Sequence, residues 1–175
     1  MKRVSVTFLF LIICTLLKPV HGAQCEQDEY NDFDFWLGVW VVTTPDGNSA
    51  GNNTIQKDYD NCVITEHYET KDGPYGMSIN IYDKTTGKWY QTWVDKTGLR
   101  LQLAGGLHNN AMILYGKRKT KEGKMIDHKI SWTPQQNGSV IQHWEMRKVD
   151  NGSWRTLFKG IYTNSSLSSK NLHVN

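Results

Sequence analysis

The stretch Thr85-Thr86-Gly87-Lys88-Trp89-Tyr90-Gln91-Thr92-Trp93-Val94-Asp95-Lys96-Thr97-Gly98 contains the pattern that decides the fold. Glycine-containing turns bound a short segment, 88–95, that is rich in aromatic and β-branched residues. Successive side chains of a strand point to opposite faces, so Trp89, Gln91 and Trp93 share one face. The segment therefore predicts a strand between two tight turns.

The same pattern recurs along the chain from residue 38 onward. Clusters containing Gly, Asn or Asp separate the runs, and no long stretch has helical spacing. The predicted strands are 38–44, 53–59, 62–70, 76–83, 88–95, 99–105, 111–118, 126–133, 139–148 and 153–162. A meander of this length has exposed edges unless it closes. The expected fold is therefore all-β, an up-and-down antiparallel β-barrel of about ten strands with a short N-terminal leader segment.

The first residues have the pattern of a secretory signal peptide. Lys2 and Arg3 precede an apolar run over 6–17, and a cleavage pattern ends before Ala23. The alternative, a membrane anchor, needs about 20 apolar residues. The chain of 175 residues thus predicts a signal peptide at 1–22, a single barrel domain at 23–162 and a polar tail at 163–175. The mature protein is expected to be secreted, extracellular or, in a bacterium, periplasmic.

The charge of the mature chain is expected to be balanced. Three of the basic residues and no acidic ones lie in the first 22 positions, which leaves 17 of each sign. This balance argues against nucleic acid or an anionic membrane as the main partner. A basic cluster is predicted at one hairpin tip, and it is interpreted as a solvated turn in preference to a docking patch because no aromatic residues interleave it. Its members are Lys117, Arg118, Lys119, Lys121 and Lys124.

Removal of the signal peptide leaves two cysteines, Cys25 and Cys62, which are expected to form one disulfide. Their spacing is unlike that of a metal site, and no metal ligand is assigned. Four sequons predict possible N-glycosylation of a secreted protein, although Asn-Gly also favours hairpin turns. The sequon asparagines are Asn52, Asn137, Asn151 and Asn164.

Alternation along the strands predicts an interior that mixes tryptophan with polar side chains. The candidate ligand-binding residues are Asn80, Gln91, Trp93, Trp132, Gln142 and Trp144. Two interpretations remain open: a cavity for a small apolar molecule, or a filled core whose polar groups satisfy one another. Ten strands enclose more space than eight, which favours the cavity.

The chain has none of the common motifs of hydrolases, kinases or zinc enzymes. Glu66 and His128 are the acid and the imidazole that alternation places inside the barrel, where we expect them to meet. A buried carboxylate with a raised pKa can act as a general base, so both are candidate catalytic residues of a cofactor-free enzyme. The alternative is that Glu66 only accepts hydrogen bonds within the core. His67 and His143 are expected to face outward.

The stretch Asp32-Phe33-Asp34-Phe35-Trp36-Leu37-Gly38-Val39-Trp40 carries a family resemblance. Its Gly-x-Trp is similar to the opening of lipocalins and other calycins, and the longer string resembles a mainly bacterial family of uncharacterised lipocalin-like proteins. The likeness extends over about 33–162 and departs at Val39, where that family more often has an acid. It implies a barrel with a ligand cavity and no known activity. Nitrobindin-like haem barrels are more distant in shape, and no motif here selects an axial histidine, so no cofactor is expected.

Three functions remain open from the sequence. The first is a secreted protein that binds a small apolar molecule in its barrel. The second is a secreted barrel enzyme that transforms such a molecule without a cofactor, as an isomerase, a cyclase or a luciferase-like oxygenase. The third is a purely structural extracellular protein, against which the seven tryptophans and the absence of repeats both argue. The sequence assigns neither a ligand nor an oligomeric state.

Processing of the N-terminus gives the first testable prediction. Protein recovered from a secreting host should begin near Ala23, with Cys25 and Cys62 joined, because the apolar run is short and the remaining cysteine count is even. Intact mass before and after reduction and alkylation measures both. Two thiols that alkylate without reductant would contradict the disulfide.

Overall fold

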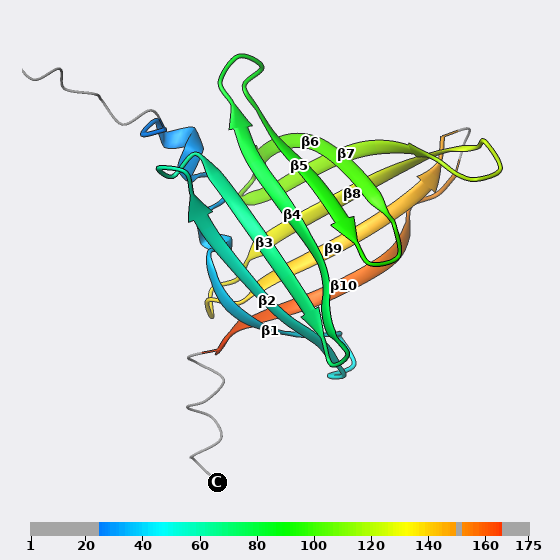
Figure 1. The fold of residues 1–175 in the computed structure, drawn as a ribbon, viewed down its shortest axis with the longest axis horizontal. Coiled ribbons are helices and arrows are strands. Elements are labelled where there is room, and N and C mark those ends of the chain that lie inside the picture. Colours follow the sequence, from blue (N-terminus) through cyan, green and yellow to red (C-terminus); the bar gives the residue numbers. More distant parts are fainter. Residues whose placement is uncertain (1–24, 150–151, 166–175) are drawn as a thin grey trace, which may run out of the picture.

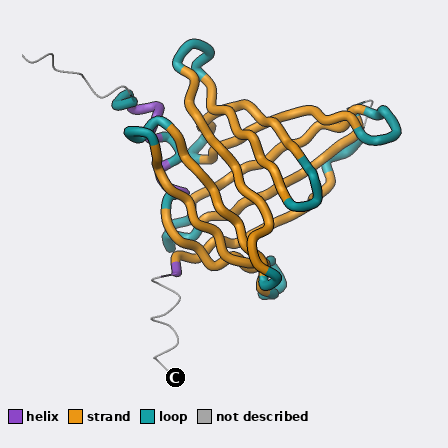
Figure 2. Tube along the Cα trace, in the orientation of Figure 1, coloured by secondary structure: helices purple, strands orange, loops and turns teal. Residues whose placement is uncertain are grey.

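The computed structural model describes residues 25–149 and 152–165, and in this part of the chain ten antiparallel strands form one closed barrel (Figures 1 and 2). The strands are β1 (Gly38–Thr43), β2 (Ser49–Asp58), β3 (Val63–Thr70), β4 (Gly73–Asp83), β5 (Lys88–Asp95), β6 (Arg100–His108), β7 (Ala111–Lys119), β8 (Met125–Pro134), β9 (Val140–Lys148) and β10 (Arg155–Asn164). Each strand pairs with its sequence neighbours, and β1 pairs with β10. The prediction of an up-and-down barrel is confirmed. Closure pairs the backbone groups that an open edge would expose.

Two strands begin earlier than the sequence predicts. β2 starts at Ser49, because the small polar residues that resemble a loop pair with the end of β1 across an irregular register. Within that segment Gly51 has φ 150°, and a Cβ there would lie 2.1 Å from the carbonyl oxygen of Glu69. β4 starts at Gly73, because the β3–β4 turn needs only two residues and Pro74 is accommodated beside a register shift. Tertiary pairing therefore overrides local turn propensity at both places.

The N-terminal leader folds over one end of the barrel. It contains two short 3₁₀ helices, η1 (Asp28–Asn31) and η2 (Asp34–Trp36). Phe33 and Trp36 stack with ring centroids 4.8 Å apart, and Phe33 meets Trp89 of β5 and Trp132 of β8 edge to face at 5.7 and 5.2 Å. All four side chains are buried. The part of the Phe-Asp-Phe-Trp string that precedes β1 thus forms an aromatic plug.

Three contacts tie the plug to the strands. The predicted Cys25–Cys62 disulfide is present and joins the leader to the β2–β3 turn. Lys57 of β2 pairs with Asp34 at 2.7 Å, and the indole Nε1 of Trp40 donates to the carbonyl oxygen of Trp36 at 2.9 Å. A disulfide closing a loop of 37 residues typically contributes about 3–4 kcal/mol. The closed end is therefore held covalently as well as by packing.

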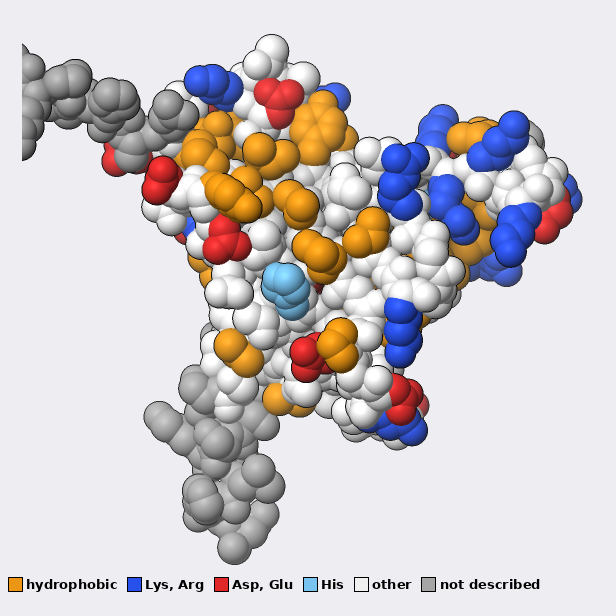
Figure 3. Space-filling model, viewed as in Figure 1, with side chains coloured by type: hydrophobic (Ala, Val, Ile, Leu, Met, Phe, Trp, Pro, Cys, Tyr) orange, Lys and Arg blue, Asp and Glu red, His pale blue; other side chains and the backbone are white. Residues whose placement is uncertain are grey.

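The opposite end of the barrel carries the β7–β8 hairpin with the basic cluster. Its five cationic side chains are exposed, and Figure 3 shows Lys and Arg side chains gathered toward the end of this hairpin. The Nζ atom of Lys117 lies 3.9 Å from Oδ1 of Asp127, and among the described residues this is the only acidic contact of Lys117. No described helix is both long and apolar enough for a membrane span.

Candidate functional site

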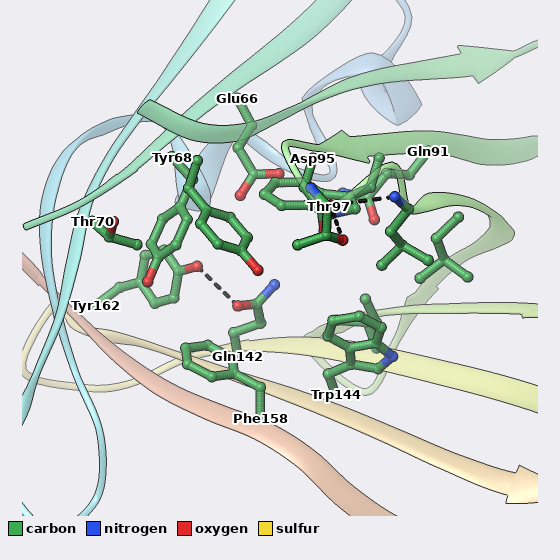
Figure 4. A pocket seen from close by; sticks show the side chains of 15 residues that line it. Glu66, Tyr68, Thr70, Gln91, Asp95, Thr97, Gln142, Trp144, Phe158 and Tyr162 are labelled. Carbon is green, nitrogen blue, oxygen red and sulfur yellow. Dashed lines mark hydrogen bonds between the residues drawn. The ribbon is translucent and has the colours of Figure 1, made fainter. Parts of the chain in front are cut away.

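A cavity of about 380 Å³ occupies the barrel interior between the plugged end and the β3–β4 and β5–β6 turns (Figure 4). This volume falls within the usual range for small-molecule sites. Six aromatic residues line it: Tyr68, Tyr75, Trp93, Trp144, Phe158 and Tyr162. The remaining lining residues are Glu66, Thr70, Gln91, Asp95, Thr97, Leu99, Leu101, Ile130 and Gln142. The walls are thus mainly apolar. Glu66, Gln91 and Gln142 are polar groups within the cavity, and Thr70, Asp95 and Thr97 lie nearer the two turns.

Two glycines give the aromatic rings room along the wall. A Cβ on Gly76 would lie 2.5 Å from the indole of Trp93, and a Cβ on Gly160 would lie 2.8 Å from the ring of Phe158. Each ring therefore lies over the bare backbone of a glycine. The cavity remains open because these large side chains lie close to the barrel wall.

Glu66 is the buried acid of the cavity. Its oxygen Oε1 accepts a hydrogen bond from Asn53 Nδ2 at 2.7 Å, and its oxygen Oε2 accepts one from the Ser78 hydroxyl at 2.6 Å. Burial raises the pKa of Glu66 to about 7, although both hydrogen bonds act to lower it. The side chain is therefore divided between its neutral and ionised forms near neutral pH.

A polar layer surrounds this carboxyl group. Ser78 accepts hydrogen bonds from Asn80 at 3.0 Å and from Gln91 at 3.3 Å, and it donates to Glu66. On the other side, Tyr162 accepts from Asn53 at 3.3 Å and donates to Gln142 at 2.9 Å. Burial, followed by the nearby Glu66, raises the pKa of Tyr162, so its phenol stays neutral. The donors of Ser78 and Asn53 converge on Glu66.

The expectation that Glu66 and His128 meet is wrong. Both are buried, but the Nδ1 atom of His128 accepts a hydrogen bond from Trp144 Nε1 at 3.1 Å, and Glu66 has other partners. Burial and the positive charge of Arg118 lower the pKa of His128. His128 does not line the cavity, because Trp144 does so from the adjacent strand. His128 is therefore a neutral supporting residue for Trp144.

The other predicted ligand residues divide into two groups. Trp93, Gln91, Gln142 and Trp144 line the cavity. Asn80 and Trp132 are buried but lie outside its lining. Asn80 donates a hydrogen bond to Ser78, and Trp132 of β8 packs against Phe33 of the plug.

Several residues that line or support the cavity are not among the candidate ligand-binding residues predicted from the sequence. Asp95 continues the face of Gln91 and Trp93, so alternation on 88–95 carries the signal for it. Phe158 and Tyr162 share a face of β10 with Gly160 between them. Asn53 begins the predicted strand 53–59 and shares a face with Ile55, so alternation carries a signal for it as well.

The predicted modification sites stay predictions. Asn52 and Asn137 are exposed on β2 and on the β8–β9 turn, Asn164 ends β10, and Asn151 lies outside the described residues. The predicted signal peptide at 1–22 also lies outside them. His67 is exposed. His143 lies on the outer face, where its Nε2 atom is 2.8 Å from the hydroxyl oxygen of Thr156. No described cluster of three or more His, Cys, Asp or Glu side chains is arranged to hold a metal ion.

No protein-family model matches this chain, and no curated protein matches it significantly. The lipocalin-like resemblance therefore rests on the motifs within 33–162. The closed antiparallel barrel agrees with that resemblance at the level of fold.

The pKa of Glu66 gives a prediction for stability. It is 4.5 in an ordinary environment and about 7 here, so the folded state holds a proton that the unfolded state has lost. The stabilisation is complete below about pH 4.5 and is lost as the pH rises through about 7. The free energy of unfolding of the native protein, minus that of Glu66→Gln, should fall by roughly 3 kcal/mol over this range.

Denaturant unfolding at a series of pH values measures this difference. Glu69→Gln removes an exposed acid from the same strand and serves as the matched control, with a nearly constant difference. A constant difference for Glu66→Gln would contradict the raised pKa.

Proposed function

We propose that the protein binds a small, largely apolar molecule inside the barrel, with the polar end of the molecule directed at Glu66. The observation that carries this proposal is the cavity of about 380 Å³, with aromatic walls and a small number of polar side chains that include Glu66 (Figure 4). Binding sites for small molecules commonly combine an apolar wall with a few placed polar groups. A filled core in which every polar group serves only its neighbours would leave no such space.

The aromatic plug supports this proposal. Phe33 and Trp36 close one end, so the cavity is blind on the side of the leader. The lining residues nearest the other end are Thr70, Tyr75, Asp95 and Thr97, which lie beside two turns. A ligand would enter between these turns with its polar end first.

We also propose that the protein is a secreted lipocalin-like carrier. The apolar N-terminal run and the Cys25–Cys62 disulfide support secretion. The Gly38-x-Trp40 opening and the closed barrel support the lipocalin-like assignment. Binding does not require a cofactor in this proposal.

Blocking the entrance tests the binding proposal. N-phenyl-1-naphthylamine, an uncharged apolar probe, should bind saturably with one site per chain and gain fluorescence. Thr70→Trp adds a large side chain to the cavity entrance and should weaken the probe's affinity at least about tenfold, because an overpacked site excludes ligand.

His67→Trp is the matched control, since it adds the same side chain to the exposed face of β3 and should leave affinity unchanged. Failure of the probe to bind the native protein would contradict the proposal. Equal binding to Thr70→Trp would place the probe elsewhere.

The second candidate function, a cofactor-free enzyme, is favoured by one observation. A carboxyl group with a pKa of about 7 lines the cavity, and this value suits a general base at neutral pH. His128 has no part in this version, because it lies behind Trp144.

Mass spectrometry of ligand recovered after incubation separates the two functions. A carrier returns its ligand unchanged, whereas an enzyme returns a product. Under the enzyme hypothesis, Glu66→Gln should abolish turnover while keeping the shape of the site. Unchanged turnover in that variant would remove Glu66 from any catalytic role.

A further inference from the structure

The charged groups that line the cavity have one sign. They are Glu66 within the polar layer and Asp95 near the β5–β6 turn, and the lining includes no Lys, Arg or His. Asp95 accepts hydrogen bonds from the backbone N–H of Thr97 at 2.8 Å and from Trp93 Nε1 at 3.3 Å. Burial acts to raise the pKa of Asp95, but hydrogen bonds from the hydroxyl and the backbone N–H of Thr97 and from Trp93 hold it below its ordinary value, so Asp95 is ionised. A ligand in this cavity meets two acids and no fixed positive charge.

Glu66 has hydrogen-bonding capacity that its neighbours leave unused. The hydroxyl of Tyr68 donates to the carbonyl oxygen of Ala50 at 2.6 Å, and that of Tyr162 donates to Gln142. Each oxygen of Glu66 accepts one hydrogen bond from a described residue, although a carboxylate oxygen can accept two. The cavity therefore retains acceptor capacity at Glu66, while the phenolic protons of Tyr68 and Tyr162 are engaged elsewhere.

Aromatic side chains form much of the cavity wall. Tyr68, Trp144 and Phe158 line the cavity together with Glu66 (Figure 4), and Trp93 lines it as well. Trp93 lies in the same cross-strand row as Glu66, through Ser78. Aromatic faces attract cations, and this attraction is stronger where water is excluded.

We propose that the ligand is an organic cation, an apolar molecule that carries a protonated amine, and that its ammonium group binds Glu66 between the aromatic walls. This inference rests on the proposed function and names the chemical class of the ligand. An ammonium brings the positive charge that the lining lacks, and its N–H groups can donate to the remaining lone pairs of Glu66. A carboxylate ligand would meet repulsion from Glu66 and Asp95, and a neutral ligand would leave the buried carboxylate without a counter-charge.

Other titratable groups facing Glu66 do not supply that charge. Tyr68 on β3 and Tyr162 on β10 both have raised pKa values, chiefly because of burial, and remain neutral phenols. Asp95 is a second acid, and His128 lies behind Trp144 with a lowered pKa. Binding of the amine should therefore strengthen with rising pH as Glu66 ionises.

Three probes with the same chain and different head groups test the inference: decylamine, decanol and decanoate. Calorimetric titration at about pH 8, where Glu66 is mostly ionised and an alkylamine still protonated, should give decylamine at least about tenfold tighter binding than decanol, with decanoate the weakest. Glu66→Gln should abolish the preference for decylamine over decanol. Glu69→Gln, which removes an exposed acid from the same strand, should keep it.

The possible outcomes separate the two proposals. Equal binding of decanol and decylamine to the native protein would overturn the cation inference and leave the binding proposal standing. A preference that persists in Glu66→Gln would also overturn it. If neither these probes nor N-phenyl-1-naphthylamine binds, the proposed function itself fails. A decylamine affinity that falls as the pH rises from about 5 to about 8 would show the wrong sign for pairing with ionised Glu66.

Discussion

The two hydrogen bonds that Glu66 accepts, from Asn53 and Ser78, hold an acid inside a barrel whose other interior groups are mostly apolar. Isolated burial of a carboxylate is costly, and these donors offset part of that cost. They also keep the side chain beside the cavity with lone pairs to spare. The polarity of the cavity, its response to pH and the class of ligand that we propose all depend on this arrangement.

The aromatic plug turns the barrel into a container with one closed end. Ten strands enclose more space than their own side chains fill, and Phe33 and Trp36 occupy that space only near the leader. The disulfide and the Lys57–Asp34 pair hold the leader in place. The remaining volume lies against Glu66, with Trp93 and Phe158 accommodated over glycines. The leader therefore closes one end of the barrel and leaves the cavity in the remaining space.

The sequence predicted the barrel well because alternation and turn residues are local signals. The strand 88–95 has the same bounds in the structure, and Glu66 lies inside as its position in β3 implies. The start of β2 was missed because pairing with β1 decides it. The predicted contact between Glu66 and His128 is wrong, because an inward-facing position does not specify which interior side chains touch. Which side chains touch depends on the register of the strands around the barrel. In the structure, Trp144 Nε1 donates a hydrogen bond to His128 Nδ1.

The most direct test of the account is the titration of the Glu66 side-chain carboxyl carbon by NMR, assigned by its loss in Glu66→Gln. In the free protein the carboxyl should titrate near its pKa of about 7, and saturating decylamine should lower that pKa, because a neighbouring cation favours the ionised form. An ordinary carboxyl pKa in the free protein, or a pKa that decylamine leaves unchanged while it binds, would contradict the claim that Glu66 receives the polar end of the ligand.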